Sequence, residues 1–225
     1  ESSRNGLTLI AAEHPEWLAA DIAVLLEPSN ANIEAGCQGT LRASISTSGK
    51  RAHSARSWLG ENAIHNLNAI LETLNSYEPA KVLIDGLEYR EGLNAVAISG
   101  GVAGNIIPDH ALVDVNYRYA HNKSGAEAEQ HIRDTFKGFS VTFTDNAPGA
   151  MPGLDRAALA DLVSRVDGQV APKFGWTDVA RFSAMGVPAV NLGPGDPGLA
   201  HSRNEFVPVS QLRKCEETVF SWLRG

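Results

Sequence analysis

The chain has 225 residues and a formal net charge of -7 at pH 7, with 43% hydrophobic and 20% charged residues. This length is enough for one large domain or two small ones, and the composition is ordinary for a globular protein that is soluble in water. The negative charge and sparse Lys and Arg pairs argue against a nucleic-acid partner, and without a run of about 18 apolar residues we expect no membrane span.

The first elements indicate the start of an α/β domain. Residues 5–13 predict a short helix, which Pro15 ends. Residues 21–26 are an apolar run, as expected of a strand that is buried on both faces. The strand leads into the turn signal Glu27-Pro28-Ser29-Asn30.

The pattern changes at residue 39, where apolar and polar residues begin to alternate. The elements predicted from here are a strand at 40–48, a helix at 61–76, strands at 94–99 and 111–119, a helix from the capping box at Ser124-Gly-Ala-Glu127 to about 136, and a strand at 139–144. This order is the split βαββαβ pattern. We therefore expect a ferredoxin-like domain at 39–145.

A Pro/Gly-rich linker at 146–153 then returns the chain to an α/β pattern. Helices are predicted at 155–167 and 178–185, a short apolar strand at 188–192, and a last helix at about 209–223 that should bury Leu212, Val219, Phe220 and Leu223. The fold class is thus α/β, with residues 1–38 and 146–225 forming one domain that residues 39–145 interrupt.

Two residues lie where such a domain would bind a ligand. His201 follows the Gly/Pro loop 193–198 after a predicted strand, and Glu27 ends another apolar strand. Ligands of α/β sheets bind at the carboxyl ends of strands, and imidazole and carboxylate groups are zinc ligands. Taken singly, each residue is better explained as a structural one: His201 as a surface-loop histidine and Glu27 as an acid that opens a turn.

Seven segments in the same order and spacing resemble one family of enzymes. They are Leu26-Glu-Pro-Ser29, Gly49-Lys-Arg-Ala-His-Ser-Ala55, Gly104-Asn-Ile-Ile-Pro108, Asn116-Tyr-Arg-Tyr119, Trp176-Thr-Asp-Val-Ala-Arg-Phe182, Gly193-Pro-Gly195 and Ala200-His-Ser-Arg-Asn-Glu205. The family is that of the dinuclear-zinc metallopeptidases, which includes aminoacylases, glutamate-releasing carboxypeptidases and deacylases. The resemblance implies a zinc-peptidase-like α/β domain with an inserted ferredoxin-like lid that forms a homodimer.

The resemblance also implies roles for single residues. Glu27 and His201 would each ligate one of two zinc ions, or of two cobalt ions in their place. His53, in the lid, would reach across the dimer and donate a hydrogen bond to the developing oxyanion. Asn105, Arg118, Thr177, Arg181 and Gly193 would bind substrate. Arginine suits a substrate carboxylate because guanidinium and carboxylate groups pair in a bidentate manner. For Arg118, a surface pair with Asp114 is the alternative.

The remaining histidines are expected to be structural or on the surface; they are His14, His65, His110, His121 and His131.

Four residues of the family's catalytic set have no counterpart in this sequence. It has no His-x-Asp triplet, and its one adjacent pair of acids, Glu216-Glu217, falls in the last predicted helix. One protein ligand per metal is too few, because zinc sites normally use three or more. We therefore expect this chain alone to be inactive.

Within the family, the segments around Cys37 and His53 are most similar to actinobacterial enzymes that cleave N-succinyl-LL-2,6-diaminopimelate to succinate and diaminopimelate for lysine and cell-wall synthesis. Another N-acyl-amino-acid deacylase, such as one acting on acetylornithine, is the alternative enzyme. A non-catalytic dimerisation or ligand-binding module is the alternative of another class. Cys37 and Cys215 have no C-x-x-C spacing, so we expect a reducing, cytoplasmic setting.

Overall fold

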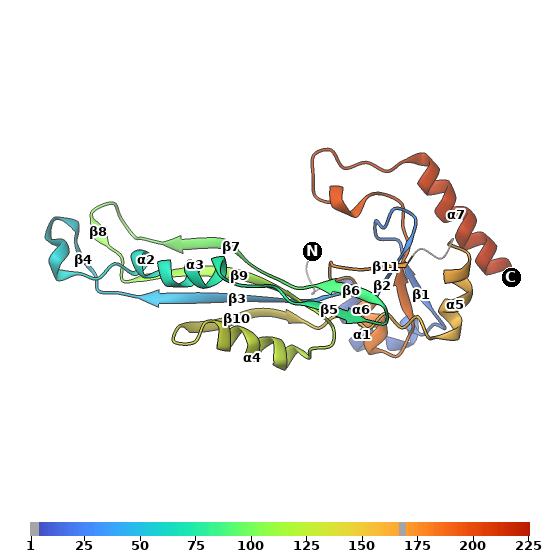
Figure 1. Cartoon of the computed structure of the whole chain (residues 1–225), viewed down its shortest axis with the longest axis horizontal. Helices are drawn as coiled ribbons and strands as arrows, with labels where there is room; N and C mark the ends of the chain where they lie inside the picture. The colour runs from blue at the N-terminus through green and yellow to red at the C-terminus, as the bar shows by residue number, and fades with distance from the viewer. Residues whose placement is uncertain (1–4, 167–169) are drawn as a thin grey trace. The chain divides into compact units, whose positions relative to one another are not determined.

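The computed structural model describes residues 5–166 and 170–225, which form two compact units (Figure 1). Unit 1 comprises the described residues up to Gln38, Val82–Tyr89 and Gly149–Gly225, and unit 2 comprises Gly39–Lys81 and Arg90–Pro148. Residues 82–89 therefore group with unit 1, whereas the sequence had assigned them to the inserted domain.

Unit 2 is built on a four-stranded antiparallel sheet (Figure 1). Its strands are β3 (Gly39–Ser48), β7 (Gly92–Gly100), β9 (His110–Tyr119) and β10 (Ser140–Ala147). They lie in the order β10-β3-β9-β7, so the first and third long strands are central. This is the ferredoxin-like arrangement that the βαββαβ pattern predicts, and the predicted α/β fold class is confirmed.

One face of this sheet carries the core of unit 2. Helices α2 (Ala63–Asn66), α3 (Asn68–Asn75) and α4 (Gly125–Thr135) contribute to one apolar cluster with Leu41, Ala43 and Ile45 of β3. The alternate β3 residues point to the other, open face, as the period of two requires. The capping box predicted at Ser124 opens α4.

Two short ribbons in the chain were not predicted. Strands β4 (Ala52–His53) and β8 (Ile106–Ile107) pair, with the 3₁₀ helix η2 (Ser54–Leu59) after β4. Strands β5 (Lys81–Ile84) and β6 (Leu87–Arg90) form a hairpin. Its turn, Asp85-Gly86, has φ values of 50° and 80°, as two-residue hairpin turns require.

Unit 1 contains a second four-stranded sheet, in the order β1-β12-β2-β11. Its strands are β1 (Ala23–Leu25), β2 (Ile33–Ala35), β11 (Val170–Pro172) and β12 (Ala189–Asn191). Its helices are α1 (Gly6–Glu13), α5 (Ala157–Ser164), α6 (Val179–Ala184) and α7 (Val209–Arg224), with 3₁₀ turns η1 (Pro15–Leu18) and η3 (Pro197–Leu199). None of the helices in the described parts of the chain is long and apolar enough to cross a membrane.

Three predictions about unit 1 need correction or limits. Strand β1 is only half-buried, because it is an edge strand. Strands β2 and β11 were not predicted, since three residues are too short to show alternation. The helix predicted at 155–167 ends at Ser164, and residue 167 lies outside the described residues.

Of the four α7 residues predicted to be buried, Val219 packs against the core and the other three do not. Leu212, Phe220 and Leu223 are 48%, 51% and 67% exposed. The residues that face the core of unit 1 are Cys215, Val219 and Trp222, which pack against the cluster that includes Leu159 and Leu162 of α5. The helix has two apolar stripes, and the sequence pattern does not distinguish which one packs.

Candidate functional site

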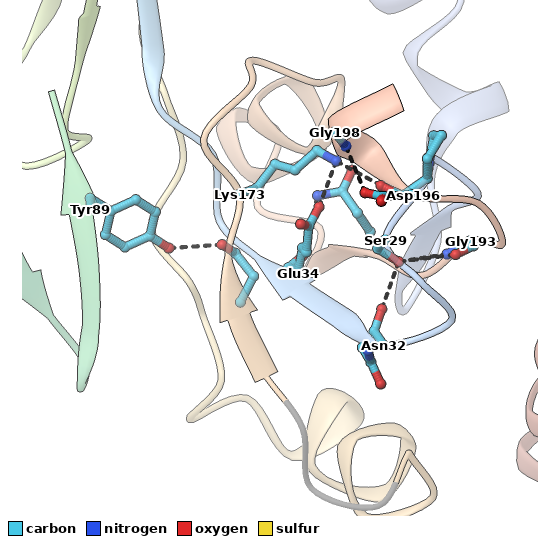
Figure 2. A network of polar contacts seen from close by, with 11 residues as sticks. Ser29, Asn32, Glu34, Tyr89, Lys173, Gly193, Asp196 and Gly198 are labelled. Atoms are coloured by element: carbon cyan, nitrogen blue, oxygen red, sulfur yellow. Dashed lines mark hydrogen bonds and ion pairs between the residues drawn. The ribbon is translucent and has the colours of Figure 1, made fainter. Parts of the chain in front are cut away.

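The turn that carries Glu27 is joined to the loop after β12 (Figure 2). Strands β1 and β12 are parallel neighbours. Glu27 and Gly193 each follow the carboxyl end of one of these strands, so both lie at the same end of the sheet. The Gly193 N–H donates to Ser29 Oγ at 2.9 Å, and its carbonyl accepts from the Ala31 N–H at 2.9 Å. A Cβ atom on Gly193 would lie 2.4 Å from the Glu27 carbonyl oxygen. Glycine is therefore required for this close approach.

The same turn adopts a strained conformation. Asn30 and Ala31 are consecutive non-glycine residues with φ values of 55° and 53°. The Asn30 N–H donates to the Gly195 carbonyl at 2.8 Å, and Gln211 of α7 accepts from the Gly195 N–H at 2.7 Å. Such backbone conformations persist where surrounding contacts determine them, and they cluster at functional sites.

A buried ion pair reaches the turn from β2 and β11 (Figure 2). Lys173, directly after β11, donates from Nζ to Glu34 Oε2 at 2.5 Å and to the Pro28 carbonyl at 3.1 Å. Tyr89 on β6 donates to the Ala35 carbonyl at 2.7 Å. Neither Lys173 nor Glu34 was singled out in the sequence, because each is a single charged residue beside a strand too short to recognise.

His201 lies exposed on the loop that continues from Gly195. Its φ is 64°, and its N–H donates to Glu205 Oε2 at 3.1 Å. The hydrogen bond from the His201 backbone to the Glu205 carboxylate holds the loop and does not involve the His201 imidazole nitrogens. The ring therefore has the exposure that a metal ligand needs.

Glu27 and His201 fit a zinc site by donor type, and Glu27 also by its place just after the carboxyl end of β1. They do not complete one: among residues 5–166 and 170–225, no three His, Cys, Asp or Glu side chains are grouped so that they could hold a metal ion. Further ligands would therefore have to come from outside the described residues.

His53 and Asn105 meet in unit 2. The β4–β8 ribbon pairs His53 with Ile106, and the Ser54 N–H donates to the Asn105 carbonyl at 2.9 Å. The His53 ring caps η2, because its Nδ1 accepts from the Ala55 N–H at 3.0 Å. A neutral ring that accepts at Nδ1 carries its proton on Nε2. The Nε2–H of this exposed side chain then points away from the cap as a donor.

Arg118 lies elsewhere in unit 2, on the open face of the sheet. It lines a pocket of about 590 Å³ together with Arg42, Asp114 and Asn116. Arg118 is opposite Thr40 of β3, and Asn116 is opposite Arg42, so the two arginines are diagonal neighbours. Asp114 accepts from the Ser44 hydroxyl. The pocket thus offers two guanidinium groups and one carboxylate.

Thr177 and Arg181 are close together in unit 1, at the start of α6. Thr177 is buried, and among residues 5–166 and 170–225 its Oγ1 has no partner at normal hydrogen-bond geometry. Arg181 Nε donates to Asp178 Oδ1 at 3.1 Å, and its guanidinium lies 6.0 Å from the Trp176 ring centre. Burial raises the pKa of the neighbouring Cys37 thiol, which argues against a thiolate ligand or nucleophile here.

Within each unit, the structure places the predicted residues in separate sets. Glu27 and Gly193 share one edge of the unit 1 sheet, and His53 and Asn105 share one ribbon of unit 2. A cavity of about 360 Å³ between residues 149–153 and α6 is lined by none of the predicted site residues. An α/β sheet interrupted by an inserted ferredoxin-like domain is the fold class that the resemblance to zinc metallopeptidases implies.

Comparison with known proteins agrees with this class. Residues 36–141 match the model of the peptidase dimerisation domain family. A Mycobacterium tuberculosis protein whose name assigns it to the succinyl-diaminopimelate desuccinylases is 55% identical over 227 residues, which cover 100% of this chain and 64% of that protein. The succinyl-diaminopimelate desuccinylase of Corynebacterium glutamicum is 51% identical over 214 residues, covering 92% of this chain and 58% of that enzyme.

Solved structures share the fold at lower identity. A tripeptidase from Staphylococcus aureus has a TM-score of 0.72 at 20% identity, over 94% of this chain and 58% of that one. An M20 family metallo-carboxypeptidase from Sulfolobus solfataricus has a TM-score of 0.72 at 15% identity, over 97% and 66%. The resemblance inferred from the seven segments is thus confirmed. The chain spans under two thirds of the length of the curated relatives named above.

Proposed function

We propose that the whole protein containing this sequence is a metal-dependent amide hydrolase that releases succinate from N-succinyl-LL-2,6-diaminopimelate. The 51% identity to the Corynebacterium glutamicum desuccinylase, over 92% of this chain, is the observation that carries the proposal. The placement of Glu27 and Gly193 at one sheet edge supports it, because that edge is where α/β sheets bind ligands. Zinc is the metal that the carboxylate and imidazole ligands favour.

In this proposal unit 2 supplies groups for the substrate rather than for the metal. His53 donates from Nε2 to the oxygen that gains charge as the amide is attacked, and its cap on η2 fixes that proton in place. Arg118 pairs with a substrate carboxylate, with Asn105 beside His53 as a further contact. Thr177 and Arg181 of unit 1 bind the same substrate.

We also propose that the protein is a homodimer that pairs through unit 2. Strand β7 is an edge of the sheet, carries no charged residue, and exposes Val96 and Ile98 at 62% and 55%. Proteins seldom leave a long uncharged edge open.

Both cysteines lie outside any disulfide, which supports a reducing, cytoplasmic setting.

A substrate panel tests the reaction. We expect the whole protein with zinc or cobalt to hydrolyse N-succinyl-diaminopimelate with a kcat/KM at least about 100-fold above that for acetylornithine, because the acetyl group lacks the succinyl carboxylate. Chelation should abolish turnover, and added metal should restore it. A preference for acetylornithine or a dipeptide would replace the substrate. Absence of turnover on every member, with metal bound, would favour a non-catalytic module.

A further inference from the structure

The buried ion pair of Lys173 and Glu34 stands beside the residue proposed to ligate the metal. The two side chains are 9% and 14% exposed. Lys173 also donates to the carbonyl of Pro28, which directly follows Glu27 in the chain (Figure 2). The ammonium therefore connects a buried carboxylate to the backbone of the Glu27 turn.

Burying this pair is costly unless the charges do something that apolar side chains cannot. Well-packed hydrophobic residues in place of a buried ion pair often leave stability unchanged or improve it. Here the ammonium satisfies a carbonyl three residues beyond the end of β1, and proline has no N–H of its own to add to the turn. An apolar side chain at position 173 would fill the space but leave the Pro28 carbonyl without this donor.

Backbone hydrogen bonds hold both residues of the ion pair in place. Glu34 lies in β2, between β12 and β11, and its carbonyl accepts from Asn191 Nδ2 at 3.2 Å. The Lys173 N–H donates to the Ala35 carbonyl at 3.2 Å, and the Lys173 carbonyl accepts from the Gln38 N–H at 3.2 Å. The backbones of Lys173 and Glu34 are thus held by hydrogen bonds at the sheet, as a support for another residue requires.

Contacts with the backbone hold the turn in place both before and after Glu27. Before it, Gly193 packs against the backbone of Leu26 and Glu27. After it, Lys173 binds Pro28, and Ser29 is held by Gly193. With its neighbours fixed on each side, the Glu27 backbone has little freedom to rotate.

We propose that Lys173, oriented by Glu34, is a positioning residue that holds the Glu27 carboxylate in place for the metal. The inference rests on the proposed function, in which Glu27 is a metal ligand. A purely structural pair would stabilise unit 1 and leave the metal affinity unchanged, so these two quantities distinguish the roles.

Zinc affinity of the whole protein, measured by competition with a chelator, and the melting temperature of the metal-free protein test this role. Lys173→Met removes the ammonium and keeps the side-chain stem. The double variant Lys173→Met with Glu34→Leu removes both charges, so it leaves no unpaired buried acid. We expect both to bind zinc about 10- to 100-fold more weakly, as for other groups that orient a ligand. If Lys173→Met does not fold, the double variant carries the test.

Arg165→Met is the matched control. Arg165 also combines an ion pair, with Asp161 at 3.2 Å, and a bond to a backbone carbonyl, that of Ser221 at 2.7 Å, but neither partner adjoins a proposed ligand. It should leave zinc affinity unchanged. Wild-type zinc affinity in the double variant, whatever its melting temperature, would overturn the positioning role. Glu27→Ala serves as the reference: if it too binds zinc normally, the assignment of Glu27 as a ligand is what fails.

Discussion

The hydrogen bond from the Ala55 N–H to His53 Nδ1 sets the proton of a single imidazole ring. Two substitutions separate the cap from the donor. An asparagine can keep an acceptor near Nδ1 but has no group at Nε2, whereas a glutamine places an amide N–H near Nε2. We expect His53→Asn to lower kcat by about 100- to 1,000-fold, the usual loss for an oxyanion donor, and His53→Gln to retain more activity.

Steady-state kinetics of the whole protein measure this difference. KM should change little in both variants, because the donor acts on charge that develops during the reaction. His131 is a suitable control histidine: its Nε2 lies 2.9 Å from the Tyr77 hydroxyl, and burial lowers its pKa. A larger loss in His53→Gln than in His53→Asn would indicate that the cap, rather than the donor, matters.

At the scale of elements, two strand-end loops hold each other through Gly193. An alanine at this position would place Cβ 2.4 Å from the Glu27 carbonyl oxygen and 2.5 Å from that of Leu26, so backbone must move. We expect Gly193→Ala to lower the free energy of unfolding by about 1–3 kcal/mol, the usual cost of overpacking. Gly175→Ala, where no atom lies within 4 Å of the added Cβ, should change it by under about 0.5 kcal/mol.

Urea denaturation of the three proteins measures these free energies. If Gly193→Ala is as stable as Gly175→Ala, the loops can separate without cost, and Gly193 cannot be what fixes the Glu27 turn. Unchanged stability in Gly193→Ala would also argue against the inference that contacts hold the turn on both sides of Glu27.

Long elements could be predicted from the sequence, and short ones could not. In strand β3, apolar and polar residues alternate along a strand of ten residues, and helix α4 begins with a capping box. Strands β2 and β11 have three residues each, and their pairing is long-range. The same limit explains why Lys173 was missed: its partner at Glu34 lies 139 positions away, and no local pattern joins them. Glu27 and His201 were also selected by their positions after predicted strands, whereas the other site residues came from the family resemblance; all of their roles stay predictions.

At the scale of the whole molecule, assembly depends on the edge strands of the unit 2 sheet, which are β10 and β7. Strand β10 contains the charged residue Asp145, and a charge on an edge strand discourages pairing with another chain. Strand β7, residues GLNAVAISG, contains no charge over its nine residues, and its last seven residues are exposed. Of the two edges, β7 is therefore the one suited to a second copy.

Lysines on β7 test this interface. We expect the pair Val96→Lys and Ile98→Lys to convert the dimer to a monomer, because buried ammonium groups without partners oppose edge pairing. The melting of unit 2 should change little, since both side chains point to solvent. Light scattering after size-exclusion chromatography gives the mass. Leu83→Lys is the control and should stay dimeric, because Leu83 of β5 is 73% exposed and lies outside the β7 edge. If His53 acts across the dimer, the monomer should also lose turnover while retaining metal. A lysine variant that remains a dimer would move the interface away from β7.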